Sequence, residues 1–395
     1  MFRRFAVLAG TVFGVVSLAI AAGDFRIDSY GARTDGTKCT AAFADALKAA
    51  VAAGGGRIVV PKGEWLTGPI DLASRVTLHL EEGAKLIFTD DPADYPLVST
   101  PHNGWICKLH KPLVEARDAE HVGITGKGLL TCRTERWWSP NFWKGDRRQL
   151  KERPHFILFW NCRDVLMDGF TVRESPRWTI HLYRCAGVTV RNLDVAAHGP
   201  NSDGIDIEHT RDVLLENCTF EQNDDAICFK AGRDAFGRQV GIPTENVKVR
   251  NCTISTGHTM FGFGSELSAG IRNVDIADCR VTGKVGNVFR FKTNPLRGGF
   301  VENVRIRNIK VADGGANVLN FTNTYFFDPK KVKGRELVPT RVSDIDIADV
   351  EVDKAERVVR VEASEDNPLK RIKFKNVRVH AAAKPDIVRN AEIER

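Results

Sequence analysis

The sequence predicts an all-β fold, a parallel β-helix, from two observations. The first is a phrase, Val-x-Val/Ile-x-Asn/Asp-Cys/Ile/Val-x-Val/Ile, that returns along most of the chain, as at residues 188–195, 213–220, 247–254 and 274–281. Each copy alternates apolar and polar residues, which is the pattern of a strand. The second is the step between copies, which varies from 23 to 41 residues from Val165 onward. Variable steps in this range are typical of a solenoid, here of about ten coils, with loops of different length.

Other β architectures fit these steps less well. A propeller needs about four strands per blade at steadier spacing, and a two-sheet sandwich is the other alternative. A single helix is expected at residues 40–53, where Thr40 is placed to cap it and three glycines at 54–56 end it. A helix ahead of the strands would cover the first open edge of a solenoid.

The nine cysteines are explained mainly by the repeat. Because no close pair has metal-ligand spacing, we expect an inward-facing ladder of thiols, with at most one or two bridges. The five cysteines in or beside the phrase are Cys162, Cys185, Cys218, Cys252 and Cys279.

The first 21 residues are expected to be a secretory signal peptide. Arg3 and Arg4 precede an uncharged apolar run at residues 5–19, and Ala19-Ile20-Ala21 is a small-x-small site. The run is short for a membrane span. Residues 22–395 are then one β-helix domain of a secreted or periplasmic monomer with no membrane attachment. The formal net charge of +7 suits a polyanionic partner, and the absence of a basic run or basic-aromatic motif disfavours nucleic acid.

An unusual set of polar residues recurs in four successive copies of the phrase. In a stacked solenoid, residues at similar distances from the start of each copy lie above one another, so this set predicts one patch on one face. A polar turn at a strand end is the simpler explanation of Asp-Asp alone, but it would not recur in this order. Counted from the first valine of each copy, Asp203 lies at 15, Asp224 and Asp225 at 11 and 12, His258 at 11, and Arg290 and Lys292 at 16 and 18.

These residues resemble the polygalacturonases, glycoside hydrolase family 28, over essentially the whole mature chain. The matching motifs are Asn201-Ser202-Asp203, Asn223-Asp224-Asp225, Gly257-His258-Thr259 and Arg290-Phe291-Lys292, together with Gly54–Pro61 and Ser175–His181. The family is a single-stranded right-handed parallel β-helix that acts on pectin. Four positions depart from the family pattern, at 202, 223, 259 and 291, and none of them removes a titrating group.

The resemblance implies a role for each residue. Asp224 would be the general acid, Asp203 and Asp225 would activate water with inversion at the anomeric carbon, and His258 would tune their protonation. Arg290 and Lys292, two alternate strand residues, would clasp a uronate carboxylate. No metal or cofactor is implied. The remaining expected substrate contacts are Lys230, His181 and Tyr325, with Trp178 as a further candidate, whereas Asp206 and Asp212 are interpreted as loop and turn residues.

Two other function classes remain open on the sequence alone. A pectate lyase shares this fold and substrate, and the three aspartates could bind the Ca²⁺ that it requires. A non-catalytic β-helix would bind an oligosaccharide without cleaving it. Exo or endo action and a rhamnogalacturonan-type specificity also stay open, although Asp225 and His258 favour a galacturonate polymer.

Overall fold

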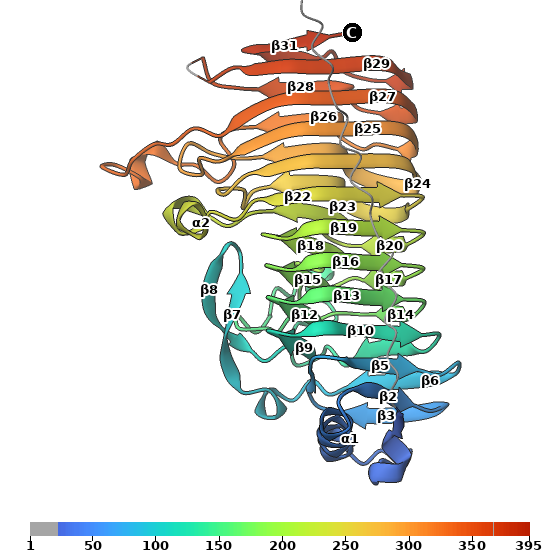
Figure 1. Ribbon diagram of the computed structural model, residues 1–395. Coiled ribbons are helices and arrows are strands. Elements are labelled where there is room, and N and C mark those ends of the chain that lie inside the picture. Colours follow the sequence, from blue (N-terminus) through green and yellow to red (C-terminus); the bar gives the residue numbers. More distant parts are fainter. Residues whose placement is uncertain (1–22, 366) are drawn as a thin grey trace, which may run out of the picture.

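The computed structural model describes residues 23–365 and 367–395. The predicted signal peptide lies outside the described residues. Within them, no helix is long and apolar enough to cross a membrane. The chain winds into a column of stacked coils in which nearly all strand pairs are parallel, so the predicted β-helix is confirmed (Figure 1).

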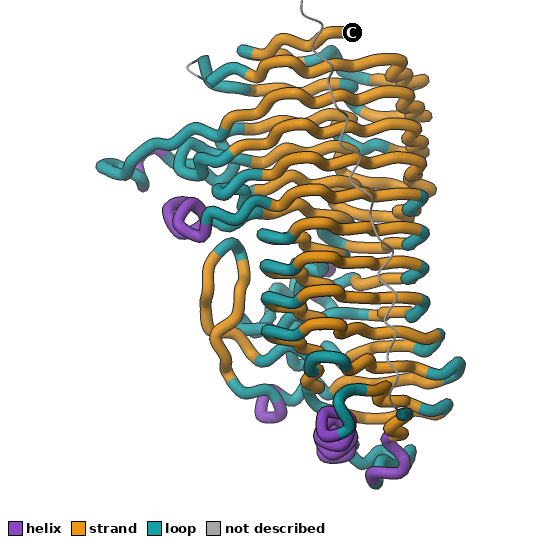
Figure 2. Tube along the Cα trace, in the orientation of Figure 1, coloured by secondary structure: helices purple, strands orange, loops and turns teal. Residues whose placement is uncertain are grey.

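Each coil places strands in three stacks that run the length of the column (Figures 1 and 2). The first stack begins with β1 (Asp24–Arg26), β2 (Gly56–Val60), β5 (Val76–Leu80), β10 (Glu120–Gly126), β13 (Arg163–Asp168), β16 (Ala186–Arg191), β19 (Arg211–Glu216) and β22 (Thr244–Arg250). The second begins with β3 (Gly63–Thr67), β6 (Ala84–Phe88), β11 (Leu129–Cys132), β14 (Thr171–Arg173), β17 (Asp194–Ala197) and β20 (Thr219–Gln222). The third contains β4 (Ile70–Leu72), β9 (Val114–Arg117), β12 (Ile157–Trp160), β15 (Ile180–Tyr183), β18 (Ile205–Glu208), β21 (Ile227–Lys230), β26 (Asn317–Thr322), β28 (Val359–Glu362) and β30 (Ile387–Arg389).

In the C-terminal coils, long strands bend from one stack into the next. They are β23 (Thr253–Gly264), β24 (Ile271–Lys292), β25 (Phe300–Asp313), β27 (Arg341–Ala355) and β29 (Leu369–Ala382), and β31 (Ala391–Glu394) ends the chain. The 3-10 turns are η1 (Ile27–Tyr30), η2 (Pro92–Asp94), η3 (Phe142–Lys144) and η4 (Pro329–Lys331).

The predicted N-terminal helix is α1 (Thr40–Ala52), which contacts β1, β2 and β4 at the start of the column. It buries Ala42, Phe43, Ala46 and Ala50. The prediction that Thr40 caps it is wrong. Cys39 occupies the N-cap position and makes no side-chain cap, whereas the Thr40 hydroxyl accepts a hydrogen bond from the amide of Gly68.

The Asn/Asp position of the repeated phrase is the corner between the first two stacks. Asn217, Asn251 and Asp278 all have positive φ there, a conformation that Asn and Asp tolerate better than most residues. Their side chains can also bond from coil to coil, as when the Asn251 amide donates to Asn217 Oδ1 at 2.8 Å. The repeat therefore encodes the corner as well as the strands.

The interior of the column is one continuous apolar core. On the third stack, Phe263 stacks on Phe229 at 4.7 Å and on Phe291 at 4.5 Å between ring centroids. The five ladder cysteines are buried as predicted. All nine cysteines, each within the described part of the chain, are free thiols, so the one or two bridges allowed for are not formed.

Several segments outside the coils project beside the third stack, and two of them contact each other (Figure 1). One is an antiparallel hairpin of β7 (Leu97–His102) and β8 (Trp105–His110), and the other is α2 (Asp234–Val240). Figure 1 shows the hairpin reaching along the lower coils toward α2.

Candidate active site

A polar pocket of about 230 Å³ lies over the third stack, where the turns that precede β18 and β21 meet the C-terminal end of β24. It is lined by Asn103, Trp178, Asn201, Asp203, Asp224, Asp225, Lys230, Arg233, Ser265, Glu266, Lys292, Arg297, Tyr325 and Phe326. The three predicted catalytic aspartates are thus together in one pocket.

Strand register places the aspartates. Ile205 pairs with Ile227, so Asp203 and Asp225, each two residues earlier, lie on neighbouring coils, and the Gly204 amide donates to Asp225 O at 3.0 Å. Position 204 must be glycine in this arrangement, because a Cβ there would lie 2.5 Å from the Ala226 carbonyl oxygen. The His258 amide likewise donates to Asp224 O at 2.9 Å. The prediction that residues at similar positions in successive coils lie together is therefore confirmed for these four residues.

The predicted cations reach the site differently. Lys292 is buried and donates a hydrogen bond to Asp225 Oδ2, and its ammonium lies 5.7 Å from the ring centroid of Tyr325. Arg290 is not among the pocket-lining residues. Its Nη1 lies 3.4 Å from His258, whose Nδ1 is 3.4 Å from Asp225 Oδ1.

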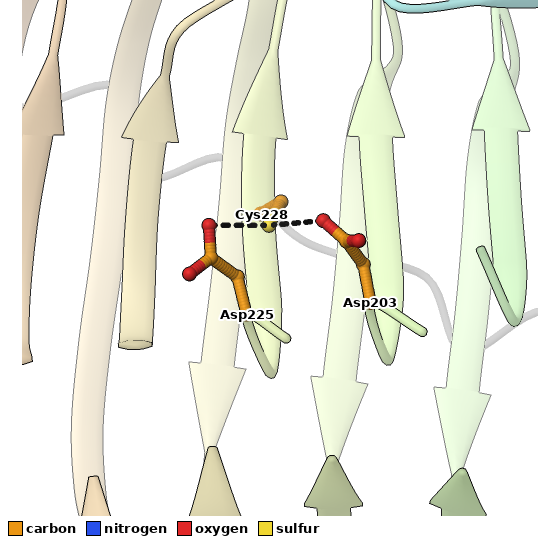
Figure 3. Close-up of side chains that lie close together, drawn as sticks. All are labelled: Asp203, Asp225 and Cys228. Carbon is orange, nitrogen blue, oxygen red and sulfur yellow. Dashed lines mark hydrogen bonds between the residues drawn. The ribbon is translucent and has the colours of Figure 1, made fainter. Parts of the chain in front are cut away.

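A thiol connects two of the carboxylates. Figure 3 shows Cys228 of β21 with its sulfur between Asp203 and Asp225. Its Sγ is 3.6 Å from Asp203 Oδ2 and 3.8 Å from Asp225 Oδ2, and the residue has no exposed surface. Burial raises the pKa of the Cys228 thiol well above its usual range, so the group remains a donor.

The environments of the three aspartates push their pKa values apart. Burial, with repulsion from Asp206 and Asp224, holds the pKa of Asp203 well above its usual range. Burial and the charge of Asp225 also raise the pKa of Asp224. Burial acts against the charge of Asp225 too, but Lys292 and His258 outweigh it and hold the pKa of Asp225 well below its usual range. Two carboxyl groups thus favour the protonated form beside one that favours the ionised form.

Lys230, a predicted substrate contact, lines the pocket and is held by two acids. Its Nζ lies 3.0 Å from Glu266 Oε2 and 3.5 Å from Asp206 Oδ1, and 4.7 Å from the ring centroid of Trp178. The interpretation of Asp206 as a loop residue is wrong, because it lies in β18 and is fully buried. Burial raises the pKa of Asp206 to about 8 despite the nearby ammonium.

The structure does not bring His181 to the pocket surface. It is fully buried, and its Nε2 lies 2.9 Å from Glu208 Oε2. Burial lowers the pKa of His181 to about 3, so this imidazole is neutral. Tyr325 does line the pocket, beside Phe326, which is 87% exposed.

Several pocket residues escaped the sequence analysis. Asn103, Arg233, Glu266 and Arg297 come from loops and turns outside the repeated phrase, so no periodic signal marks them. Cys228, which lies between two of the carboxylates, belongs to none of the phrase positions and was not among the predicted site residues. The motif order identified the carboxylates but not the groups that surround them.

Two groups of side chains within the described residues have the spacing of metal ligands. They are Asp203, Asp225 and Cys228, and Asp224, Asp225 and His258. Calcium prefers six to eight oxygen ligands. Each group offers only two carboxylates with a thiol or an imidazole, and the shared Asp225 already accepts from Lys292. The donor set fits Ca²⁺ poorly.

Comparisons with known proteins agree with this architecture. The model of the glycosyl hydrolases family 28 matches residues 54–394. A probable polygalacturonase of Vitis vinifera is 28% identical over 378 residues, covering 90% of this chain and 74% of the relative. The crystal structure of a hyperthermoactive exopolygalacturonase from Thermotoga maritima is similar at a TM-score of 0.85 with 30% identity, covering 94% of this chain and 90% of that one. A polygalacturonase from Erwinia carotovora shares the fold at a TM-score of 0.75 and 18% identity, with coverages of 95% and 96%.

Proposed function

The chain belongs to the glycosyl hydrolases of family 28, and we propose that it is a polygalacturonase that hydrolyses α-1,4-galacturonosidic bonds of pectin with inversion. The protein is a glycoside hydrolase by family. The observation that carries the finer proposal is the convergence of Asp203, Asp224 and Asp225 in one pocket that also contains lysines and arginines. Such a pocket combines an acid and a base with cations suited to an anionic sugar.

Asp224 is the general acid in this proposal. It is the aspartate of the three whose side chain is partly exposed, at 30%, so it can meet the glycosidic oxygen. Its raised pKa favours a carboxyl group that still holds its proton when the substrate binds. Donating that proton to the leaving oxygen lets the bond to the anomeric carbon break without forming an alkoxide.

Asp225 and Asp203 act on the attacking water. Lys292 and His258 keep Asp225 ionised, so its carboxylate accepts the proton that water loses as its oxygen bonds to the anomeric carbon. Asp203 hydrogen-bonds the same water and holds it in line. The two carboxyl groups titrate as one coupled system, because their nearest oxygens and the Cys228 sulfur all lie within 4.8 Å of one another.

The same proposal covers the substrate, the location and the oligomeric state of the protein. An acidic polysaccharide, pectin or polygalacturonate, is the partner of a monomer that is secreted or periplasmic. Arg290, at the rim beside His258, binds the carboxylate of a neighbouring galacturonate unit. No cofactor is needed for this acid–base chemistry.

Digestion of polygalacturonate with product analysis tests the proposal. A hydrolase releases saturated products with new reducing ends, and proton NMR of the first product should show the inverted anomer. Retention of configuration would refute the water-attack mechanism. Unsaturated products that require Ca²⁺ would identify a lyase, and binding without new reducing ends would identify a non-catalytic protein.

A further inference from the structure

The pocket is closed on one side by the β7–β8 hairpin. Asn103 and Gly104 form its turn, and both have positive φ, which is the geometry that an Asn-Gly hairpin favours. The Gly104 carbonyl oxygen accepts a hydrogen bond from the Arg233 amide at 3.1 Å. A Cβ on Gly104 would lie 2.5 Å from the Arg233 Cβ, so the two backbones are in direct contact.

An aromatic contact holds the hairpin in this position. The rings of Trp105 in β8 and Phe236 in α2 lie 5.8 Å apart between centroids, tilted by 32°. A Cβ on Gly104 would also lie 2.9 Å from Glu266 Cγ, so Glu266 packs against the hairpin tip as well. The hairpin tip therefore forms a continuous wall with Arg233 and Glu266. A pocket of about 230 Å³ with this wall suits one sugar unit better than the middle of a long chain.

Arg233 stands out among the cations of this pocket. Lys292 pairs with Asp225, Lys230 with Glu266, and Arg297 with Asp234. In the described part of the chain, the guanidinium of Arg233 makes no hydrogen bond or ion pair, and its Nε is buried without an acceptor. A buried donor without a partner is costly unless a ligand supplies the acceptor.

We propose that Arg233 binds the carboxylate of a terminal galacturonate, in a subsite that the hairpin tip closes, so that the enzyme acts on chain ends. This inference rests on the proposed function and names the residue that selects the end of the chain. The planar guanidinium can hold a carboxylate with two parallel hydrogen bonds, which a neutral hexose cannot accept in the same way. Lys292, predicted for this role from the sequence, is already paired with Asp225.

Binding of monosaccharides tests the subsite apart from catalysis. Calorimetric titration of the wild type should detect galacturonic acid and a much weaker interaction with galactose. Arg233→Ala should weaken galacturonic acid binding by about 10- to 100-fold, the range of a charge-assisted hydrogen bond, and Arg233→Lys by less. Arg280→Ala is the matched control, because Arg280 is exposed on β24 in the second stack and should leave binding unchanged. Equal affinity of wild type and Arg233→Ala would overturn the proposal.

Product size tests the closed end. On polygalacturonate the wild type should release single units with little early loss of viscosity, whereas Trp105→Ala, which frees the hairpin from α2, should release longer products. Thermal unfolding would verify that each variant is folded. Random-length products from the wild type would overturn the chain-end proposal while leaving hydrolysis intact. A wild type that binds galacturonic acid through Arg233 but cleaves no polygalacturonate would instead refute the proposed function alone.

Discussion

Lys292 donates a hydrogen bond to Asp225 within the pocket that both residues line, and both side chains are almost completely buried. An ion pair of this kind fixes the charge of both partners, because breaking it would leave an unpaired charge on a buried side chain. The pairing leads us to expect that Lys292 also sets the charge of Asp225, beyond the substrate contact predicted from the sequence. The Lys292 ammonium lowers the pKa of Asp225 and so favours its ionised form, which is the form that the proposed base requires.

Replacing Lys292 should therefore move the pH profile more than the affinity. A depressed pKa keeps Asp225 ionised, and activity falls as pH drops through that pKa. Lys292→Met removes the main favourable charge, so the pKa of Asp225 rises and the acidic limb of kcat/KM shifts to higher pH. The profile should be measured on galacturonate oligomers. An unchanged acidic limb with only a higher KM would indicate that Lys292 acts in substrate binding.

Asp224→Asn should lower kcat by about 10²- to 10⁴-fold, since a positioned general acid contributes about that much. Binding of galacturonate oligomers should remain close to the wild-type value, because the pocket keeps its shape. Asp203→Asn and Asp225→Asn should each be severe, yet the double variant should lose much less than the product of the two losses, because both residues serve one water. Single-turnover rates and calorimetry separate these effects. Near-normal turnover of Asp224→Asn would show that another group is the acid.

His198 should make the stability of the protein depend on pH. Its Nδ1 lies 2.9 Å from Glu174 Oε1 and its Nε2 3.1 Å from Glu221 Oε1, and these hydrogen bonds raise the pKa of His198 to about 9. A raised pKa contributes stability below the unfolded value of about 6.5, and that contribution is lost as pH rises through about 9.

The comparison of wild type with His198→Gln checks this window. The difference in Tm should be largest at pH 6 to 6.5 and should shrink toward zero near pH 9.5, within the limits set by other titrating groups. His121→Gln is the control, because His121 is an exposed histidine with one carboxylate partner, Asp164 at 3.4 Å, where His198 has two at shorter distances. A constant Tm difference across the range would mean that His198 stabilises by packing rather than by charge.

The repeat made the fold and the clustering of the three aspartates predictable. Because stacked strands keep register, Asp203 and Asp225 could be placed near each other by counting 15 residues from Val188 and 12 from Val213. Counting could not show that Lys292 turns back to Asp225, since a long side chain spans several residue positions. Counting residues also could not identify Arg233, because Arg233 reaches the pocket only where the hairpin and α2 fold beside the column.

Cys228 offers a test of how Asp203 and Asp225, the two residues proposed to activate water, share a proton. Its thiol is close enough to donate to either Asp203 or Asp225, but it has one proton, so it stabilises one charge at a time (Figure 3). Cys228→Ala removes this donor and should raise the apparent pKa of the acidic limb in the pH profile of kcat/KM. Cys228→Ser supplies a stronger donor and should restore the limb or move it below the wild-type position, because hydrogen bonds to an ionised carboxylate favour it.

A ladder cysteine provides the matched control for this pair of variants. Cys185 is also buried, but it lies on the corner that precedes β16, where its sulfur donates to the Phe159 carbonyl oxygen at 3.2 Å. Cys185→Ala makes the same substitution at another buried cysteine and should lower Tm while leaving the pH profile of kcat/KM unchanged. If Cys228→Ala and Cys228→Ser gave the same acidic limb as the wild type, the thiol would be a packing group like Cys185. A limb that moves in opposite directions for Ala and Ser can arise only from the donor, since both substitutions leave a smaller side chain under the carboxylates.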